Sequence, residues 1–203
     1  MQTTPGTSLN RVTPSAPARR GLLLLLAVVT IVVYALDQAS KAAAVARLEP
    51  GDPHALIGDL LQLHLIRNAG AAFSVATGVT WVLTVVALVV VAVVLRSARR
   101  LGSTAWAVTL GLLLGGALGN LTDRLLRAPG FGRGHVVDFL DYGGLFIGNV
   151  ADIAIVVAAA AVALQAVRGV GLDGRRGSQR DLSDAADGGA PGPTGSGDGG
   201  PHE

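Results

Sequence analysis

Two aspartates are the residues of this chain best suited to chemistry. Asp138 lies just before the last long apolar run of the sequence, and Asp152 lies in the first turns of that run. A carboxylate near the middle of a lipid bilayer costs at least about 2.5 kcal/mol, so such a residue is a candidate for function. Two carboxylates within reach of each other do not both ionise readily, so one keeps a proton while the other can deprotonate water. This pair could therefore hydrolyse an amide bond without a metal ion or a covalent intermediate.

The composition indicates an integral membrane protein. Of the 203 residues, 50% are hydrophobic and only 15% are charged, too few to coat a water-soluble domain of this length. The chain has no cysteine, which excludes disulfides, thiolate metal sites and a cysteine nucleophile. The net charge of +2 gives no reason to expect a nucleic-acid partner.

Four apolar runs are long enough to cross the hydrocarbon as helices. They cover residues 21–45, 79–95, 104–121 and 147–167. The first run could instead be a cleaved signal peptide, because Arg19 and Arg20 precede it. That alternative would leave only three spans and would discard Asp37, so we favour a membrane span.

Basic residues predict the orientation, because Lys and Arg are retained on the cytoplasmic side of a membrane. Arginines precede the first span and follow the second and fourth: Arg11, Arg19, Arg20, Arg96, Arg99, Arg100, Arg168, Arg175, Arg176 and Arg180. We therefore expect both termini and the short middle loop in the cytoplasm. The two longer connections, residues 46–78 and 122–146, would face outward.

The same pattern divides the chain into three parts. We expect a cytoplasmic extension at residues 1–20 and a four-helix membrane domain at 21–170. Residues 171–203 are rich in Gly, Asp, Ser and Pro with almost nothing to bury, which predicts a disordered cytoplasmic tail.

The first outer connection has the pattern of a strand. Apolar and polar residues alternate over residues 61–66, and turn-forming residues at 51–53 precede them. The fold class that follows is a mainly α membrane protein. It would have four transmembrane helices and a small outer-facing β-sheet between the first and second helices.

The remaining unusual polar residues fall at the outer ends of the predicted spans or, for Asn68, in the first outer connection. They are Asp37, Lys41, Asn68, Asn120, Asp123, Arg124 and Asn149. Separate solvated loops would not need amides and carboxylates at the ends of apolar helices, whereas one shared cleft at the membrane surface would. In such a cleft the three amides could hydrogen-bond a substrate backbone or an oxyanion.

Each of these features also has a purely structural interpretation. Asp37 and Lys41 are four residues apart and could form only an intrahelical ion pair. Asp123 beside Arg124 could tie a helix end to a loop. An asparagine at position 149 could cap the last helix, with Asp152 as its third residue.

Two further patterns are better explained by packing than by chemistry. Gly111, Gly115 and Gly119 form overlapping small-xxx-small steps, which are typical of closely packed membrane helices. His64 and His135 do not form an H-E-x-x-H arrangement, so we expect no metal site.

Five short motifs taken together resemble the lipoprotein signal peptidases, also called signal peptidase II. They are Asp37-Gln38-Ala39-Ser40-Lys41, Asn68-Ala69-Gly70-Ala71-Ala72-Phe73-Ser74, Gly115-Gly116-Ala117-Leu118-Gly119-Asn120-Leu121-Thr122-Asp123-Arg124, Val136-Val137-Asp138-Phe139 and Phe146-Ile147-Gly148-Asn149-Val150-Ala151-Asp152. They follow the order and spacing of that family between about residues 34 and 160. One such motif would be weak, but the five together are highly specific.

The resemblance implies a four-helix aspartic endopeptidase of the bacterial inner membrane, with an outer-facing sheet that cradles the substrate. The family removes the signal peptide from prolipoproteins, cutting on the N-terminal side of a cysteine that carries a diacylglyceryl thioether. Matched by motif, Asp138 and Asp152 resemble the catalytic pair. The positions that would support the site or hold substrate are Asp37, Lys41, Asn68, Gly70, Asn120, Asp123, Arg124 and Asn149. We expect a monomer without a cofactor, whose partners are diacylglyceryl-prolipoproteins and membrane lipid.

Two other classes of protein would also contain carboxylates at a membrane. A small proton-coupled transporter predicts polar groups spread through the membrane depth and a repeat between the halves of the chain, and the sequence shows neither. A non-catalytic scaffold predicts that the aspartates can be replaced with little loss.

Overall fold

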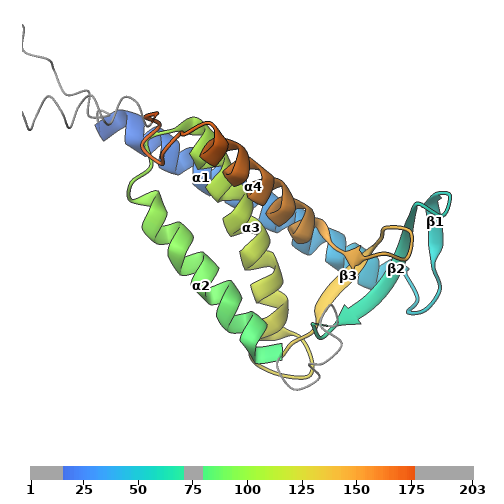
Figure 1. Cartoon of the computed structure of the whole chain (residues 1–203). Coiled ribbons are helices and arrows are strands. Elements are labelled where there is room, and N and C mark those ends of the chain that lie inside the picture. The colour runs from blue at the N-terminus through green and yellow to red at the C-terminus, as the bar shows by residue number, and fades with distance from the viewer. Residues whose placement is uncertain (1–15, 71–79, 177–203) are drawn as a thin grey trace, which may run out of the picture.

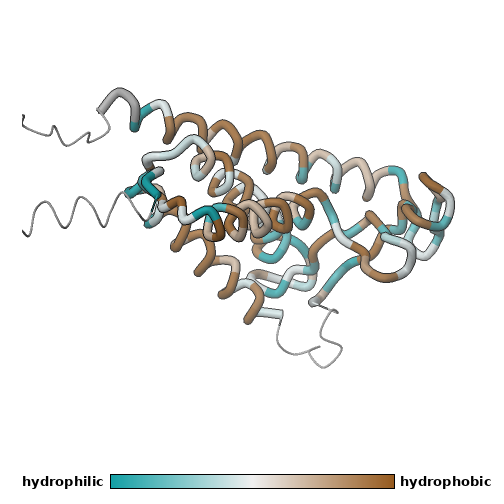
Figure 2. Tube along the Cα trace, turned by 45° about the horizontal axis from the view of Figure 1, so that its top comes forward, coloured by the Kyte–Doolittle hydropathy of each residue, from teal (hydrophilic) through white to brown (hydrophobic). Residues whose placement is uncertain are grey.

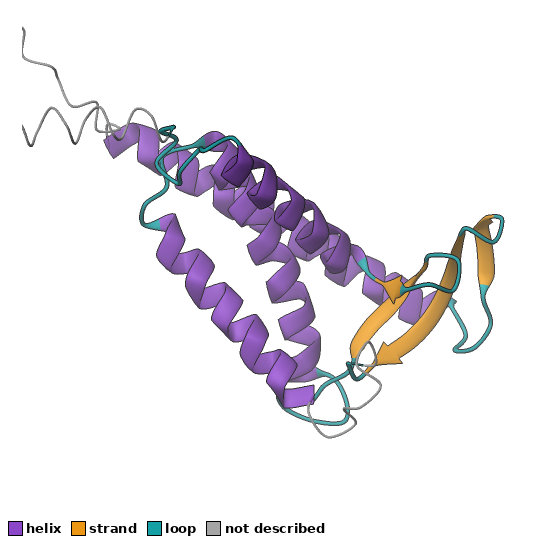
Figure 3. Ribbon diagram, in the orientation of Figure 1, coloured by secondary structure: helices purple, strands orange, loops and turns teal. Residues whose placement is uncertain are grey.

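The computed structural model describes residues 16–70 and 80–176, which form a helical bundle with a small sheet at one end (Figures 1 and 3). The elements in chain order are α1 (Ala16–Arg47), β1 (His54–Ile57), β2 (Leu61–Asn68), α2 (Thr80–Ala98), α3 (Thr104–Leu126), β3 (Val136–Asp141), β4 (Ile147–Gly148) and α4 (Val150–Val167). The predicted fold class, mainly α with a small sheet, is confirmed.

Four of these helices are long and apolar enough to cross a membrane, as predicted. Their outward surfaces carry exposed aliphatic side chains such as Leu24, Val93 and Val156, and apolar residues dominate the bundle in Figure 2. In water these side chains would be costly to expose, whereas lipid tails solvate them. The chain is therefore a multi-pass membrane protein.

Helix α3 is the centre of the bundle, because it packs against α1, α2 and α4. Its glycines permit this close approach. A Cβ at Gly111 or Gly115 would lie within 2.8 Å of the Cβ atom of Val29 or Val33, respectively, on α1. On the other side of α3, a Cβ at Gly116 would lie 2.6 Å from the backbone oxygen of Ala151 on α4. The packing role predicted for the small-residue steps therefore holds against α1, and Gly116, which those steps did not include, adds a close contact with α4.

The sheet is antiparallel with the strand order β1-β2-β3-β4, and it takes strands from both long connections. The sequence predicted only the strand at residues 61–66, which is part of β2. Residues 136–141 gave no alternating signal, because five of the six side chains of β3 are buried and a strand covered on both faces need not alternate. Asp138 lies on β3, where it is paired with Ile66 of β2.

A small apolar core attaches the sheet to the end of α1. Leu65, Val137 and Phe139 of the sheet pack with Ala44 of α1, and Leu48 lies at the edge of this cluster. Side chains alternate along a strand, so Asp138 points to the face opposite Val137 and Phe139. The Asp138 carboxylate is thereby directed toward the start of α4, where Asn149 contacts it.

At the opposite end of the bundle, the residues after α4 fold back onto the connection between α2 and α3. The backbone N–H of Gly102 donates to the carbonyl of Leu172 (2.9 Å), and the indole N–H of Trp106 donates to the carbonyl of Val170 (3.1 Å). Residues 171–176, which the sequence assigned to the tail, therefore contact the bundle. The rest of the predicted tail and residues 1–15 lie outside the described residues.

The close contact of α1 with α3 gives a test of the packing. We expect Gly115→Ala to lower the free energy of unfolding by about 1–3 kcal/mol, because its Cβ would lie 2.7 Å from that of Val33. Gly21→Ala is the matched control, since no atom lies within 4 Å of the new Cβ. Thermal unfolding in detergent, followed by tryptophan fluorescence, measures both. Equal Tm values for the two variants would contradict the packing described for α3.

Candidate active site

Asp138 is held by two amides at the point where the sheet meets the bundle. Its side chain is 2% exposed. Asn68, at the end of β2, donates from Nδ2 to Oδ2 (2.7 Å), and Asn149 donates from Nδ2 to Oδ1 (2.6 Å). Each carboxylate oxygen therefore has one amide donor, which fixes the plane of the group.

Asp152 is held by one amide and one backbone group. Asn120 of α3 donates from Nδ2 to Oδ1 (2.8 Å), and the backbone N–H of Asn149 donates to Oδ2 (3.1 Å). The side chain of Asn149 in turn accepts from the backbone N–H of Asp152 (3.1 Å), which completes a capping box at the start of α4. Asn149 therefore caps α4, as the sequence suggested, and the same residue is also part of the site.

Asn149 is the residue that brings the two aspartates together. It is fully buried and contacts Asp138 through its side chain and Asp152 through both its side chain and its backbone N–H. The two carboxylates consequently lie on either side of one asparagine, although they come from β3 and α4.

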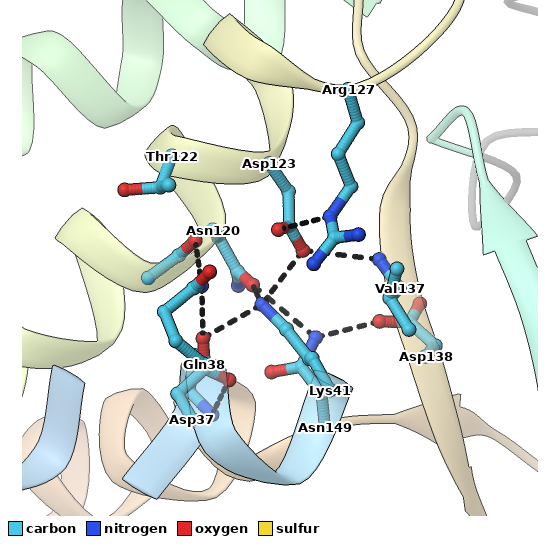
Figure 4. A network of polar contacts seen from close by, with 12 residues as sticks. Asp37, Gln38, Lys41, Asn120, Thr122, Asp123, Arg127, Val137, Asp138 and Asn149 are labelled. Atoms are coloured by element: carbon cyan, nitrogen blue, oxygen red, sulfur yellow. Dashed lines mark hydrogen bonds and ion pairs between the residues drawn. The ribbon is translucent and has the colours of Figure 1, made fainter. Parts of the chain in front are cut away.

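Lys41 of α1 lies at the centre of a second set of polar contacts (Figure 4). Its ammonium group contacts Asp37 (2.8 Å) and Asp123 (2.9 Å), and it donates to Oδ1 of Asn120 (2.9 Å). Both Lys41 and Asp37 are completely buried, and Asp123 is 1% exposed. The intrahelical pair predicted for Asp37 and Lys41 exists, but it belongs to a larger network that joins α1 to α3.

The two carboxylates paired with Lys41 each hold the backbone next to a proposed catalytic aspartate. Asp37 accepts the N–H of Ala151 (3.0 Å), the residue before Asp152. Asp123 accepts the N–H of Val137 (3.1 Å), the residue before Asp138. A single buried ammonium group therefore stabilises the anchors of both aspartates.

Lys41 also determines which way the amide of Asn120 points. An ammonium group only donates hydrogen bonds, so the side-chain oxygen of Asn120 must face Lys41. The amide nitrogen then faces Asp152, to which it donates. The buried charge thus acts on the carboxylate through one intervening amide.

Burial raises the pKa of Asp138 from 3.8 to about 6. The hydrogen bond from Asn68 opposes this rise, the negative charge of Asp152 adds to it, and the hydrogen bond from Asn149 and the charge of Lys41 oppose it. The charge on one carboxylate therefore bears on the proton affinity of the other, as a dyad requires.

Arg124 lies at the same end of α3 and is 8% exposed. Among the described residues, no hydrogen-bond partner contacts its Nη1 atom, although the charges of Asp138, Asp123 and Asp152 act on the group. Asp123 does tie the end of α3 to the following segment, as the sequence suggested, through the N–H of Val137, and the arginine paired with it is Arg127, whose Nε donates to Oδ1 of Asp123 (2.6 Å). Arg124 thus keeps a buried donor free.

The structure brings together the site residues that the sequence predicted, and Gly70 lies at the edge of this site. The backbone N–H of Gly70 donates to the side chain of Asn68 (2.7 Å), and its φ of 115° is one that side-chain-bearing residues rarely adopt. The remainder of that motif, residues 71–74, lies outside the described residues.

Two contributors to the network were not singled out from the sequence. Gln38 donates to Asp37 (3.0 Å) and to the backbone carbonyl of Gly119 (3.1 Å), and Arg127 holds Asp123. Gln38 lies directly after Asp37 in the first of the five motifs, so its position in the sequence could have identified it as a site residue. His64, considered as a metal ligand, lies 3.4 Å from the carboxylate of Asp141 on the neighbouring strand.

Four helices long enough to span a membrane, a sheet at one end and two neighbouring carboxylates define the class as a multi-pass membrane protein with an acidic site at one end of its bundle. The family model for signal peptidase (SPase) II matches residues 29–168 of the chain. A lipoprotein signal peptidase of Leifsonia xyli subsp. xyli (strain CTCB07) is 53% identical over 162 residues, which cover 79% of this chain and 74% of the relative. One from Rhodococcus jostii (strain RHA1) is 52% identical over 163 residues, which cover 80% of this chain and 82% of the relative.

Solved structures show the same fold. A structure described as a bacterial membrane enzyme superposes with a TM-score of 0.63 at 23% identity, covering 73% of this chain and 94% of that one. A second of the same description gives a TM-score of 0.62 at 25% identity, covering 72% and 88%. The chain therefore belongs to the signal peptidase II family, whose members are aspartic peptidases, and the predicted resemblance is confirmed.

The network around Lys41 predicts a large loss of stability when its charge is removed. Lys41→Met would leave the buried carboxylate of Asp37 without its cation and Asp123 with Arg127 alone, so we expect a loss of about 3–5 kcal/mol in the free energy of unfolding. Arg127→Met is the matched control, because it removes a partly exposed cation from the same Asp123. Denaturant or thermal unfolding in detergent measures both losses. A loss for Lys41→Met no larger than that for Arg127→Met would contradict the central position of Lys41.

The raised pKa of Asp138 predicts a pH-dependent contribution to stability. The folded protein holds this proton more tightly than the unfolded chain, so the contribution is fully present below pH 3.8 and is lost as the pH rises through about 6. Asp138→Asn cannot ionise. We expect its Tm, relative to that of the original protein, to rise between pH 4 and pH 7. A Tm difference that stays constant over this range would show that Asp138 titrates normally.

Proposed function

We propose that this protein removes the signal peptide from diacylglyceryl-modified prolipoproteins, cutting on the N-terminal side of the lipidated cysteine. The observation that carries the proposal is a pair of carboxylates, buried Asp138 and half-buried Asp152, that both contact Asn149. The relatives named lipoprotein signal peptidase support the substrate class.

In the proposed reaction, the two aspartates share one proton. The ionised carboxylate takes a proton from a water molecule, which attacks the carbonyl carbon of the peptide bond. The other carboxyl group gives its proton to the departing amine as the C–N bond breaks. The proton taken from water restores the starting state of the pair, so no metal or cofactor is needed.

Neighbouring groups are proposed to hold the substrate and to fix the aspartates. The free Nη1 donor of Arg124 supports a role in binding a carbonyl oxygen of the substrate backbone, because a buried donor without a partner is costly until a ligand satisfies it. Asn68, Asn120 and Asn149 donate to the aspartates. Asp37, Lys41 and Asp123 are proposed to position the backbone, and Gly70 to shape the turn that holds Asn68.

We propose that the active site faces the outer side of the membrane, with both termini in the cytoplasm. The arginines at the other end of the bundle support this orientation, among them Arg96, Arg99, Arg100 and Arg168. The substrate would remain anchored in the bilayer by its lipid and reach the site sideways as a ligand of a monomer. Confinement to the membrane would supply much of its orientation.

The test is cleavage by the purified full chain in the presence of a chelator. We expect it to cleave a diacylated prolipoprotein but not the same precursor without the lipid. Asp138→Asn and Asp152→Asn should each lower the cleavage rate by at least about 100-fold, since general acid–base catalysis contributes about 10²–10⁴-fold.

Asp59→Asn is the control for this experiment, because Asp59 is exposed in the turn between β1 and β2. It should keep the rate of the unchanged protein. Substantial turnover by either catalytic-site variant, provided that it folds, would contradict the aspartate mechanism. Equal cleavage of both precursors would contradict the substrate assignment.

A further inference from the structure

An aromatic pair lies on the turn between β3 and β4, beside the site but outside the network described above. The rings of Tyr142 and Phe146 are stacked with centroids 6.2 Å apart and an interplanar angle of 17°. The backbone N–H of Tyr142 donates to the carbonyl of Phe146 (2.8 Å), and the N–H of Leu145 donates to that of Tyr142 (3.2 Å). The turn therefore holds the Phe146 ring in a defined position.

Gly148 allows this ring to approach Asp152. A Cβ atom at Gly148 would lie 2.6 Å from Cε1 of Phe146 and 2.9 Å from Oδ2 of Asp152. The edge of the ring and the carboxylate thus flank a space that one methyl group would overfill. The charge of Asp152 also acts on Tyr142, whose pKa is raised by burial and further by that charge.

The surface of Phe146 is only partly covered. The residue is 49% exposed within the described part of the chain, although its ring edge lies against Gly148. Its neighbour Leu145 is 92% exposed and has no such contact with the site. A half-covered ring next to a proposed catalytic carboxylate is placed to meet the substrate of that carboxylate.

We propose that Phe146 is a specificity-determining residue that limits the size of the substrate side chain immediately before the cleaved bond. This inference rests on the proposed peptidase function. The residue after the cleaved bond carries the lipid, whose chains stay in the bilayer. The ring is therefore left to meet the side chain on the acyl side.

The expected size of the effect follows from the space available. One additional methylene in an apolar pocket changes relative rates by about 10–200-fold. Truncation of Phe146 removes the ring that is proposed to limit the space beside Asp152. The site should then accept a substrate with a larger side chain before the cleaved bond. The rate for a small side chain should change much less, because such a side chain does not reach the ring.

The experiment compares two diacylated prolipoprotein peptides that differ only in the residue before the cleaved bond, Ala or Leu. For each protein we measure kcat/KM for both peptides and take the Leu/Ala ratio. We expect Phe146→Ala to raise this ratio by at least about 10-fold. Phe146→Leu, which keeps an apolar side chain of intermediate size, should raise it less.

The ratio is internal to each protein, so partial loss of folded enzyme cancels. Leu145→Ala is the matched control and should leave the ratio unchanged. If the unchanged protein cleaves the Ala peptide but Phe146→Ala leaves the Leu/Ala ratio within twofold, the specificity role is overturned while the proposed function stands. If the unchanged protein cleaves neither peptide, the proposed function fails, and this inference fails with it.

Discussion

One buried ammonium group determines the geometry of the whole site. Lys41 has three donors, and the structure satisfies all three with Asp37, Asp123 and Asn120. Burying a charge without such partners would cost several kcal/mol. Because the partners come from two helices, the cost is avoided only when α1 and α3 pack in one register. The glycines of α3, Gly111 and Gly115, allow that register, so helix packing and charge pairing depend on each other.

The consequence for function is that positioning is transmitted through backbone groups and amides. Asp37 and Asp123 hold the N–H groups of Ala151 and Val137, each one residue before a proposed catalytic aspartate. Two carboxylates from separate elements thereby meet at the boundary between bundle and sheet without touching the lysine. One of them, Asp138, is buried and the other, Asp152, is half-buried, and between two such close negative charges proton sharing is favoured over full ionisation. The turn between β3 and β4 places the Phe146 ring next to Asp152, and this ring carries no charge.

The sequence predicted the four spans because long apolar runs leave few alternatives, and it predicted convergence of the polar residues because they fall at the ends of those runs. It did not predict β3, since burial of both of its faces removes the alternation that marks a strand, nor β4, which has only two residues and is too short to show a pattern. It presented the helix cap at Asn149 and the proposed catalytic pair as alternatives, whereas in the structure one asparagine caps α4 and contacts both aspartates. Contacts such as Asp123 with the N–H of Val137 depend on the tertiary fold, and no local pattern encodes them.

The most direct test of this account is the titration of Asp138 in the presence and absence of its partner charge. The carboxyl C=O band, assigned by its loss in Asp138→Asn, can be followed by infrared difference spectroscopy across pH 3 to 9. The account predicts a midpoint near pH 6 in the unchanged protein and a lower midpoint in Asp152→Asn, because the charge of Asp152 raises the pKa of Asp138. An identical midpoint in the two proteins would show that the carboxyl groups do not interact and would contradict the dyad.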